Sequence, residues 1–387
     1  MATAMKPIRR VVTGNDRQGR STVVWDGAAP NAKPAPIGAR GCTDLWAWYD
    51  TPPSITGDHD DGNLRYDFPG PCIGGHLRAT HMMMQGRPAD YDPAKDPEFI
   101  ADHEPKDAPS RRLWERGSKE FYSSAMHKTE TVDYGIVLEG ERELILDDCQ
   151  LLMKPGDIVI QVGAWHKWSC PRIGSIMVFD MISARFKDGP VGLAQSKDAV
   201  FSAEGLKLPE GVKPTRRIVT IDKEPGRSCL VSDGPAPDVR IDPARPGFAL
   251  ARLWVIDSAP AKIVAETLHL PHTIEPPAGG SVCRVVTFPP DAIWAGKVGA
   301  NEVRAFFSAM GSPGASTYSP NAPHPYMQKT RTLEFCIVLE GEIVLVLDTQ
   351  EILLKAGEIV VQRGTNHAWS NRSGKPAVVA IATHDAA

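Results

Sequence analysis

Short apolar runs bounded by turn-forming residues recur through two stretches of the chain. In the first stretch these runs lie at 134–138, 144–146, 151–153, 158–162 and 175–182. Lys154-Pro155-Gly156-Asp157 is a strong turn signal between two of them. β-branched runs of this length, with a turn about every 8–12 residues, are typical of the strands of a sandwich or closed barrel. We therefore predict an all-β fold.

Two less regular, Pro-rich stretches, 75–127 and 280–328, interrupt this strand pattern. They have room for a few short helices, which we expect near 113–123 and 302–310. Loops this long in a compact domain usually form lids, interface arms or barrel covers.

The strand pattern occurs twice. Residues 126–169 align without a gap with residues 327–370, at an offset of 201, and about half of the positions are identical. The likeness continues upstream, where Arg9-Arg10-Val11-Val12-Thr13 resembles Arg216-Arg217-Ile218-Val219-Thr220. A repeat this long indicates two copies of a whole folding unit.

The join between the copies lies in a stretch rich in Gly, Lys and Pro. We predict an N-terminal domain at 1–190, a linker at 191–213 and a C-terminal domain at 214–387. Each repeat is expected to form its own barrel, related to the other by pseudo-symmetry. Because exposed strand edges need covering, we expect either a homodimer or a tightly packed internal pair, with terminal arms crossing over.

Composition excludes several classes of protein. The 387 residues are 42% hydrophobic and 23% charged, and the formal net charge is −4 without a strongly basic stretch. We therefore expect no nucleic-acid partner, which requires clustered Lys and Arg. No apolar run approaches the ~20 residues that span a bilayer, so no membrane partner is expected, and the N-terminus does not resemble a secretory signal. The seven cysteines form no CxxC pair, which favours reduced thiols in a cytoplasmic protein.

Two motifs in each repeat resemble those of the cupin superfamily. The first cupin motif has the form HxH, then Glu, then Gly; the second has PxGxxH after a PGD-type turn. In the first repeat the matching positions are His127, Thr129, Asp133, Gly140, Gln161, Gly163 and His166. Thr129 replaces the second His, Asp133 replaces Glu, and Gln161 replaces Pro. The resemblance implies two tandem cupin domains, each a jelly-roll β-barrel, in a family whose reactions range from dioxygenases to storage proteins.

The first repeat carries the better candidate metal site. His127, Thr129 and Asp133 share one strand parity, so their side chains face the same way. His166 comes from a later strand and can approach from across the barrel. Two His and one carboxylate with open positions form the facial triad of non-haem Fe(II) oxygenases. We predict His127, Asp133 and His166 as metal ligands and catalytic residues; Fe(II) is favoured, with Zn, Mn and Ni left open.

Three further residues are candidates for substrate binding. Arg78 could bind a substrate carboxylate in a bidentate manner, Thr129 could orient a bound water, and Trp168 could face a planar substrate. In the second repeat Gln328 stands where His127 stands, leaving Glu334 and His367 as good ligands. We therefore expect the second metal site to be degenerate.

Three functions remain open. The leading hypothesis is a metal-dependent enzyme acting on a small carbonyl, carboxylate or aromatic substrate, most of all an Fe(II) dioxygenase. The second is a non-oxidative isomerase, decarboxylase or lyase that uses the ion as a Lewis acid. The third is a non-catalytic small-molecule-binding protein. No GxSxG elbow, Walker loop or GxGxxG is present, which removes serine hydrolases and nucleotide enzymes from the leading candidates.

Overall fold

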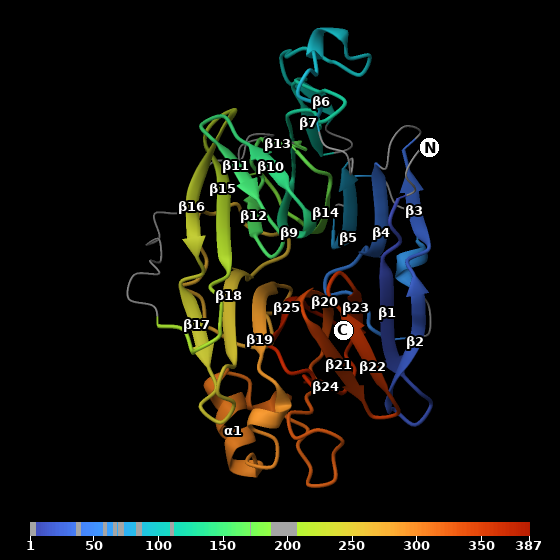
Figure 1. Cartoon of the computed structure of the whole chain (residues 1–387), viewed down its shortest axis with the longest axis vertical. Coiled ribbons are helices and arrows are strands. Elements are labelled where there is room, and N and C mark those ends of the chain that lie inside the picture. Colours follow the sequence, from blue (N-terminus) through green and yellow to red (C-terminus); the bar gives the residue numbers. More distant parts are fainter. Residues whose placement is uncertain are drawn as a thin grey trace.

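The computed structural model shows a mostly β chain with two sandwich bodies, one above the other in Figure 1. The structure describes residues 5–35, 40–56, 60–64, 68, 73–82, 87–108, 112–170, 172–186 and 207–387. Most of the predicted linker, residues 191–206, lies outside the described residues.

The first body consists of an eight-stranded sheet facing a three-stranded sheet. The order in the large sheet is β16 (Arg227–Pro235), β15 (Arg216–Glu224), β12 (Ile158–Val162), β9 (Thr131–Gly140), β14 (Ser175–Ser183), β5 (Gly75–Met82), β4 (Gly41–Trp48) and β3 (Asn31–Pro34). The small sheet runs β11 (Gln150–Met153), β10 (Arg142–Ile145) and β13 (Lys167–Ser169).

The second body repeats this plan. Its large sheet runs β17 (Asp238–Ile241), β18 (Ala249–Ile256), β19 (Ser281–Phe288), β25 (Ala377–Asp385), β20 (Thr332–Glu340), β23 (Ile359–Arg363), β1 (Arg9–Asn15) and β2 (Ser21–Ala28). Its small sheet runs β22 (Glu351–Lys355), β21 (Glu342–Leu347) and β24 (His367–Ser370). The all-β, duplicated jelly-roll prediction is confirmed, although the sheets are stacked layers and not closed barrels.

The two bodies exchange their first strands, which corrects the prediction that each repeat forms its own barrel. Strand β1 pairs in parallel with β23 of the second body, and β15 pairs in parallel with β12 of the first. The predicted domains at 1–190 and 214–387 therefore follow the sequence repeat but not the sheets. A repeat shows which strands are equivalent, but it does not show which copy each strand joins.

A buried arginine links each exchanged strand back to its own repeat. Arg10 on β1 donates to the Leu45 carbonyl oxygen at 2.7 Å, and Arg217 on β15 donates to that of Leu253 at 2.8 Å. The crossing of the arms gives a tightly packed internal pair, one of the two arrangements expected from the sequence. A homodimer stays a prediction.

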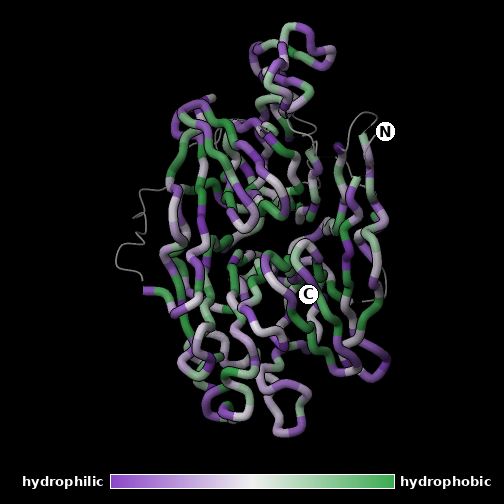
Figure 2. Tube along the Cα trace, in the orientation of Figure 1, coloured by the Kyte–Doolittle hydropathy of each residue, from purple (hydrophilic) through white to green (hydrophobic). Residues whose placement is uncertain are grey.

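The largest apolar core cluster contains residues of both bodies. Tyr134 on β9 is fully buried there, and its hydroxyl lies 3.2 Å from Ser281 Oγ of β19 in the second body. Figure 2 shows apolar residues along the inner strands and more polar residues on the loops at both ends. Tyr134 thus points away from the interior of its own body, as its parity predicts, but it meets the other body.

The irregular stretches contain little helix. One α-helix, α1 (Ala300–Ala309), lies where a helix was expected. The helix expected near 113–123 is wrong, because β7 (Leu113–Glu115) begins there and pairs with β6 (Lys106–Ala108) and β8 (His127–Thr129). Single 3-10 turns occur at η1 (Asp61–Asn63), η2 (Pro93–Lys95), η3 (Asp291–Ile293) and η4 (Pro313–Ala315). Among the described residues, no helix has the length and apolar character needed to cross a membrane.

Candidate active site

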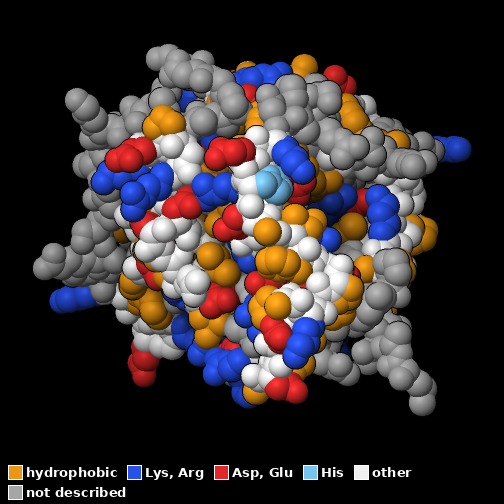
Figure 3. All heavy atoms as spheres, turned by 90° about the horizontal axis from the view of Figure 1, so that it is seen from above, with side chains coloured by type: hydrophobic (Ala, Val, Ile, Leu, Met, Phe, Trp, Pro, Cys, Tyr) orange, Lys and Arg blue, Asp and Glu red, His pale blue; other side chains and the backbone are white. Residues whose placement is uncertain are grey.

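All six residues that the sequence singled out line one cavity in the first body. Its volume is about 300 Å³. The six are Arg78, His127, Thr129, Asp133, His166 and Trp168. Arg78 lies on β5, His127 and Thr129 on β8, and Asp133 on β9, whereas His166 directly precedes β13 and Trp168 lies on it. The fold thus gathers residues far apart in sequence around one cavity. Figure 3 views the molecule from above, and positive and negative side chains are interspersed on the part of that face not drawn in grey.

The two histidines face each other across a local backbone bridge. The His127 amide donates to the His166 carbonyl at 2.9 Å, and the His166 amide donates to the His127 carbonyl at 2.8 Å. This bridge holds the two imidazole ring centroids 4.3 Å apart. The two backbone hydrogen bonds of this bridge place both rings side by side.

Both imidazoles have the same tautomer. Nδ1 of His127 bonds the Ala125 carbonyl oxygen at 2.8 Å, and Nδ1 of His166 bonds that of Ala164 at 2.8 Å. A carbonyl oxygen only accepts, so Nδ1 carries the proton and Nε2 carries a lone pair. Burial lowers the pKa of both rings, so both are neutral near pH 7. A neutral imidazole whose other nitrogen donates to a carbonyl is the usual form of a metal ligand.

Asp133 supplies a buried carboxyl group in the same cavity. Burial raises its pKa to about 7, nearby Asp180 contributes in the same direction, and a hydrogen bond with Thr131 opposes the rise. Within the described part of the chain, Asp133 Oδ1 has no hydrogen-bond partner, and neither do Nε2 and Oε1 of Gln161. Gln161 lies directly opposite Asp133 in the β12–β9 register. Buried polar atoms are seldom left unpaired, so these three atoms favour a bound partner.

The donor chemistry of this cavity fits a divalent transition metal, since two imidazole nitrogens and a carboxylate are available. In the described residues, however, no three His, Cys, Asp or Glu side chains are gathered closely enough to hold an ion. The ligand set His127, Asp133 and His166 therefore stays a prediction: the structure brings the three to one cavity but not around one point.

The predicted substrate-binding residues are each engaged by neighbours. Arg78 Nε donates to Asp44 Oδ1 at 2.7 Å, and the same carboxylate also pairs with Lys33. Thr129 Oγ1 lies 2.7 Å from Thr131 Oγ1. The Trp168 ring meets the His166 ring edge-on at 5.9 Å and so forms one apolar wall.

The sequence reasoning missed Arg142 on β10. Its side chain is almost fully buried, lines the cavity and lies 5.9 Å from the Trp168 ring centroid. Its hydrogen bonds go only to neutral groups, the hydroxyl and carbonyl oxygens of Ser175 and Thr80. Among the described residues it forms no ion pair with a carboxylate. Burial lowers its pKa to about 9, so it is still charged at pH 7.

Arg142 could have been noticed by comparing the repeats, because Ile343 occupies the aligned position in the second body. A charged residue replacing an aliphatic one on the same strand of a duplicated fold indicates a local requirement for charge. Aligning the metal motifs alone does not reveal it, because Arg142 lies between the two motifs.

The matching place in the second body is filled by its own side chains. Gln328 Nε2 lies 3.2 Å from His367 Nε2, and Glu334 lies 3.6 Å from that nitrogen. Arg284 lies 3.8 Å from Glu334 and also donates to Thr383 Oγ1. The cavity there measures only about 50 Å³. Arg284 thus supplies a positive charge beside the carboxylate, which is consistent with a degenerate metal site.

Comparison with known families supports the cupin resemblance. The Cupin_2 model, which describes a cupin domain, matches residues 314–383. This span includes Glu334 and His367, and the gapless repeat extends the same motif to the first body.

Short segments of the chain resemble fungal proteins. Phomopsin biosynthesis cluster protein D of Diaporthe leptostromiformis is 54% identical over 48 residues, which is 12% of this chain and 25% of that protein. A cupin-domain-containing oxidoreductase of Neurospora crassa is 46% identical over 46 residues, 12% of this chain and 24% of that protein. The chain thus spans about a quarter of the length of these curated relatives.

Solved cupin structures are also similar, at low scores. Quercetin 2,3-dioxygenase of Acinetobacter baumannii has 13% identity and a TM-score of 0.32, covering 80% of this chain and 74% of that one. Salicylate 1,2-dioxygenase of Pseudaminobacter salicylatoxidans has 11% identity and a TM-score of 0.33, covering 80% and 71%. Similarity at this level carries no argument about the reaction.

Proposed function

Starting from the premise that the chain is a duplicated cupin, we propose that its first body is a metal-dependent oxidoreductase site for a small planar anion. The observation that carries the proposal is the cavity of about 300 Å³, which joins two neutral imidazoles, a buried carboxyl group and a buried arginine. Among the described residues, Oδ1 of that carboxyl group has no hydrogen-bond partner and the arginine forms no ion pair. The second body then acts as a structural partner that supplies β15.

His127, Asp133 and His166 would hold the metal, with Fe(II) preferred and Zn, Mn or Ni as alternatives. When bound, the ion would supply open positions for substrate and for redox or Lewis-acid chemistry. The carbonyl oxygens of Ala125 and Ala164 keep the Nε2 atoms of both imidazoles unprotonated. No proton then has to leave either ring before it binds an ion.

Arg142 and the aromatic walls would position the substrate. The guanidinium is held in place by Ser175 and Thr80, so it is preorganised for an anionic oxygen and loses little side-chain entropy on binding. Trp168 and Phe179, whose rings contact each other edge-on with centroids 5.4 Å apart, would form one aromatic wall for a planar group. Both features favour an aromatic or conjugated carboxylate over a neutral aliphatic substrate.

A non-catalytic binding protein is the second candidate. It is favoured by one observation: in the described part of the chain, the three predicted ligands are not gathered around a point. Such a protein would bind the same planar anion through Arg142 but would hold no stoichiometric metal.

Metal content of the full chain tests the first candidate. Purified protein is loaded separately with Fe(II), Mn(II), Ni(II) or Zn(II) and its metal content is measured by elemental analysis. We expect about one ion per chain, lost in His127→Gln and retained in Gln328→Ala, which changes the aligned position of the second body. A wild-type chain that retains none of the four ions, or unchanged content in His127→Gln, would overturn the metal site.

Ligand binding tests the substrate class without relying on activity. Benzoate and benzamide have the same shape and differ in charge, so calorimetry with both isolates the contribution of Arg142. Because a hydrogen bond to a charged group contributes about 1.5–3 kcal/mol, Arg142→Met should weaken benzoate binding at least tenfold and leave benzamide unchanged. Equal loss for both ligands would indicate a collapsed pocket, and no loss for benzoate would refute the role of Arg142.

A further inference from the structure

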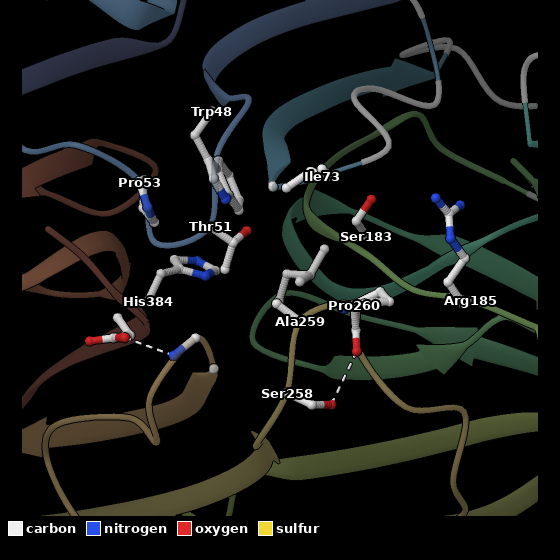
Figure 4. Close-up of a pocket in the computed structure, with 15 residues that line it drawn as sticks. Trp48, Thr51, Pro53, Ile73, Ser183, Arg185, Ser258, Ala259, Pro260 and His384 are labelled. Carbon is white, nitrogen blue, oxygen red and sulfur yellow. Dashed lines mark hydrogen bonds between the residues drawn. The ribbon is translucent and has the colours of Figure 1, made fainter.

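A second cavity, of about 380 Å³, lies between the two bodies (Figure 4). It shares no lining residue with the candidate active site. The two cavities lie on either side of strand β14: Phe179 and Met181 line the active-site cavity, whereas the next residue, Ile182, lines the inter-body cavity. Proposals about the two cavities can therefore be tested separately.

Equivalent segments of the two repeats form the inter-body cavity. Thr51 and Pro53 follow β4, and Ala259 and Pro260 stand in the same place after β18. The ends of β14 and β25 form the two remaining walls. The cavity thus lies between the matching faces of the duplicated fold, where a closely packed contact would otherwise be expected.

The two facing strand ends differ in chemistry. His384 near the end of β25 occupies the position that Ile182 holds near the end of β14, as the pairing of each strand with its neighbour shows. The imidazole of His384 packs against the rings of Trp48 and Phe335, with centroids 4.8 Å and 5.2 Å away. Figure 4 shows His384 beside Thr51 and below Trp48.

A buried carboxylate fixes the tautomer of His384. Its Nε2 lies 3.0 Å from Asp180 Oδ2, and both side chains are almost completely buried. In the neutral imidazole the carboxylate accepts from Nε2–H, which leaves the lone pair on Nδ1. Among the described residues Nδ1 has no hydrogen-bond partner, and His384 borders the cavity. The cavity wall therefore includes one imidazole acceptor held in place by Asp180.

The charged lining residues already have partners. Arg185 pairs with Glu130 at 3.0 Å, and Asp385 Oδ2 accepts the Gly279 amide at 2.7 Å. The remaining walls are largely apolar, with Trp48 and Ile182 among them. Because Arg185 is already paired with Glu130, an anionic ligand would find no free counter-charge among these residues, and the largely apolar walls favour an uncharged ring.

We propose that the inter-body cavity is a second binding site, which takes a small neutral aromatic molecule with one hydrogen-bond donor, such as a phenol. Its hydroxyl group donates to His384 Nδ1, and its ring lies among Trp48, Ile182 and the proline-containing turns. Because the site contains residues of both repeats, its ligand stabilises the contact between the bodies. This inference does not depend on the proposed oxidoreductase activity.

Calorimetry with the full chain tests this site, with phenol as the probe and anisole as its matched control. Anisole keeps the ring but has no hydroxyl donor, so we expect it to bind at least fivefold more weakly. His384→Phe keeps an aromatic ring between Trp48 and Phe335 but removes the acceptor. It should weaken phenol binding about tenfold and leave anisole binding unchanged.

A second variant tests the site even if His384→Phe does not fold. Ala259 lines the cavity from an exposed turn, so Ala259→Trp fills the space and leaves the His384–Asp180 pair intact. It should abolish binding of both probes, whereas Arg142→Met in the active-site cavity should not affect them. Phenol binding that survives Ala259→Trp, equal affinities of wild type for phenol and anisole, or no phenol binding by wild type would each overturn the proposal.

Discussion

Replacing Asp133 with Asn should stabilise the metal-free protein, and the gain should grow with pH. Burial raises the pKa of Asp133 to about 7 from an ordinary 3.8. An acid whose pKa is higher in the folded state binds its proton more tightly there, so it opposes folding increasingly as pH rises from about 4 to about 7. The asparagine side chain is close in shape to the protonated acid and has no charge to bury.

The size of the effect follows from the two pKa values. Each tenfold difference in proton affinity corresponds to about 1.4 kcal/mol. The folded and unfolded pKa values of Asp133 therefore lower the free energy of unfolding of wild type by about 4 kcal/mol at pH 8 and by less than about 1 kcal/mol at pH 4. Groups that do not interact with Asp133 are common to wild type and variant, so they cancel in the difference.

Urea unfolding of metal-free Asp133→Asn and wild type between pH 4 and pH 8 measures this difference. Glu334→Gln is the matched control at the aligned position of the second body. There Arg284 lies 3.8 Å from the carboxylate, so removing the charge leaves a buried guanidinium without its counter-ion and should destabilise at pH 8. A difference for Asp133→Asn that is flat with pH, or that favours wild type at pH 8, would refute the assignment of a desolvated, uncompensated carboxyl group.

Two further predictions concern the exchanged strand β15 and the position aligned with His127 in the second body. Asp222, which β15 carries into the first body, pairs with fully buried Lys128 at 2.5 Å. Asp222→Asn should therefore lower the free energy of unfolding, measured in urea, by about 3–5 kcal/mol. A loss below about 1 kcal/mol would show that the pair is unimportant. In the second body, Gln328→His alone should not create a metal site, because Arg284 occupies the space beside Glu334. Only Gln328→His combined with Arg284→Met should raise metal content, and metal uptake by the single variant would contradict this.

Much of the fold could be predicted from the sequence because its signals are local. The five residues of β12, four of which are β-branched and apolar, are buried at every position, as such a run between turns predicts. Gly140, at the end of β9, has φ +74°, and a Cβ there would lie 1.7 Å from the Gly174 carbonyl oxygen. The residue types at such positions themselves indicate a buried strand or a tight turn, so these elements can be identified without knowledge of the rest of the fold.

The candidate site was predictable in its residues but not in its surroundings. Strand parity and motif spacing placed His127, Asp133 and His166 correctly on one cavity. The sequence also suggested Arg78 as a binding group for a substrate carboxylate, whereas the structure pairs it with Asp44 of the neighbouring strand. Which charges are compensated depends on side chains from other strands, and that information is not contained in the spacing of any motif.

Strand exchange could not be predicted, because β1 and β15 have nearly the same sequence at their start and either pairing satisfies the backbone. The deciding contacts lie far apart in the chain. Asp222 Oδ1 accepts the amide of Trp165, the residue before His166, and Asp222 Oδ2 binds Lys128, the residue after His127. One carboxylate from the second repeat thus braces both histidine-bearing segments of the first.

This dependence gives the degenerate second body a physical role. The residue aligned with Asp222 in the first repeat is Asn15, which carries no charge, so the brace is present only in the first body. A chain that lost its second repeat would also lose β15, and with it the counter-ion of a buried lysine beside the candidate site. The second repeat can therefore carry Gln328 at the position of His127 without becoming dispensable, because the strand that it contributes stabilises the histidine-bearing segments of the first.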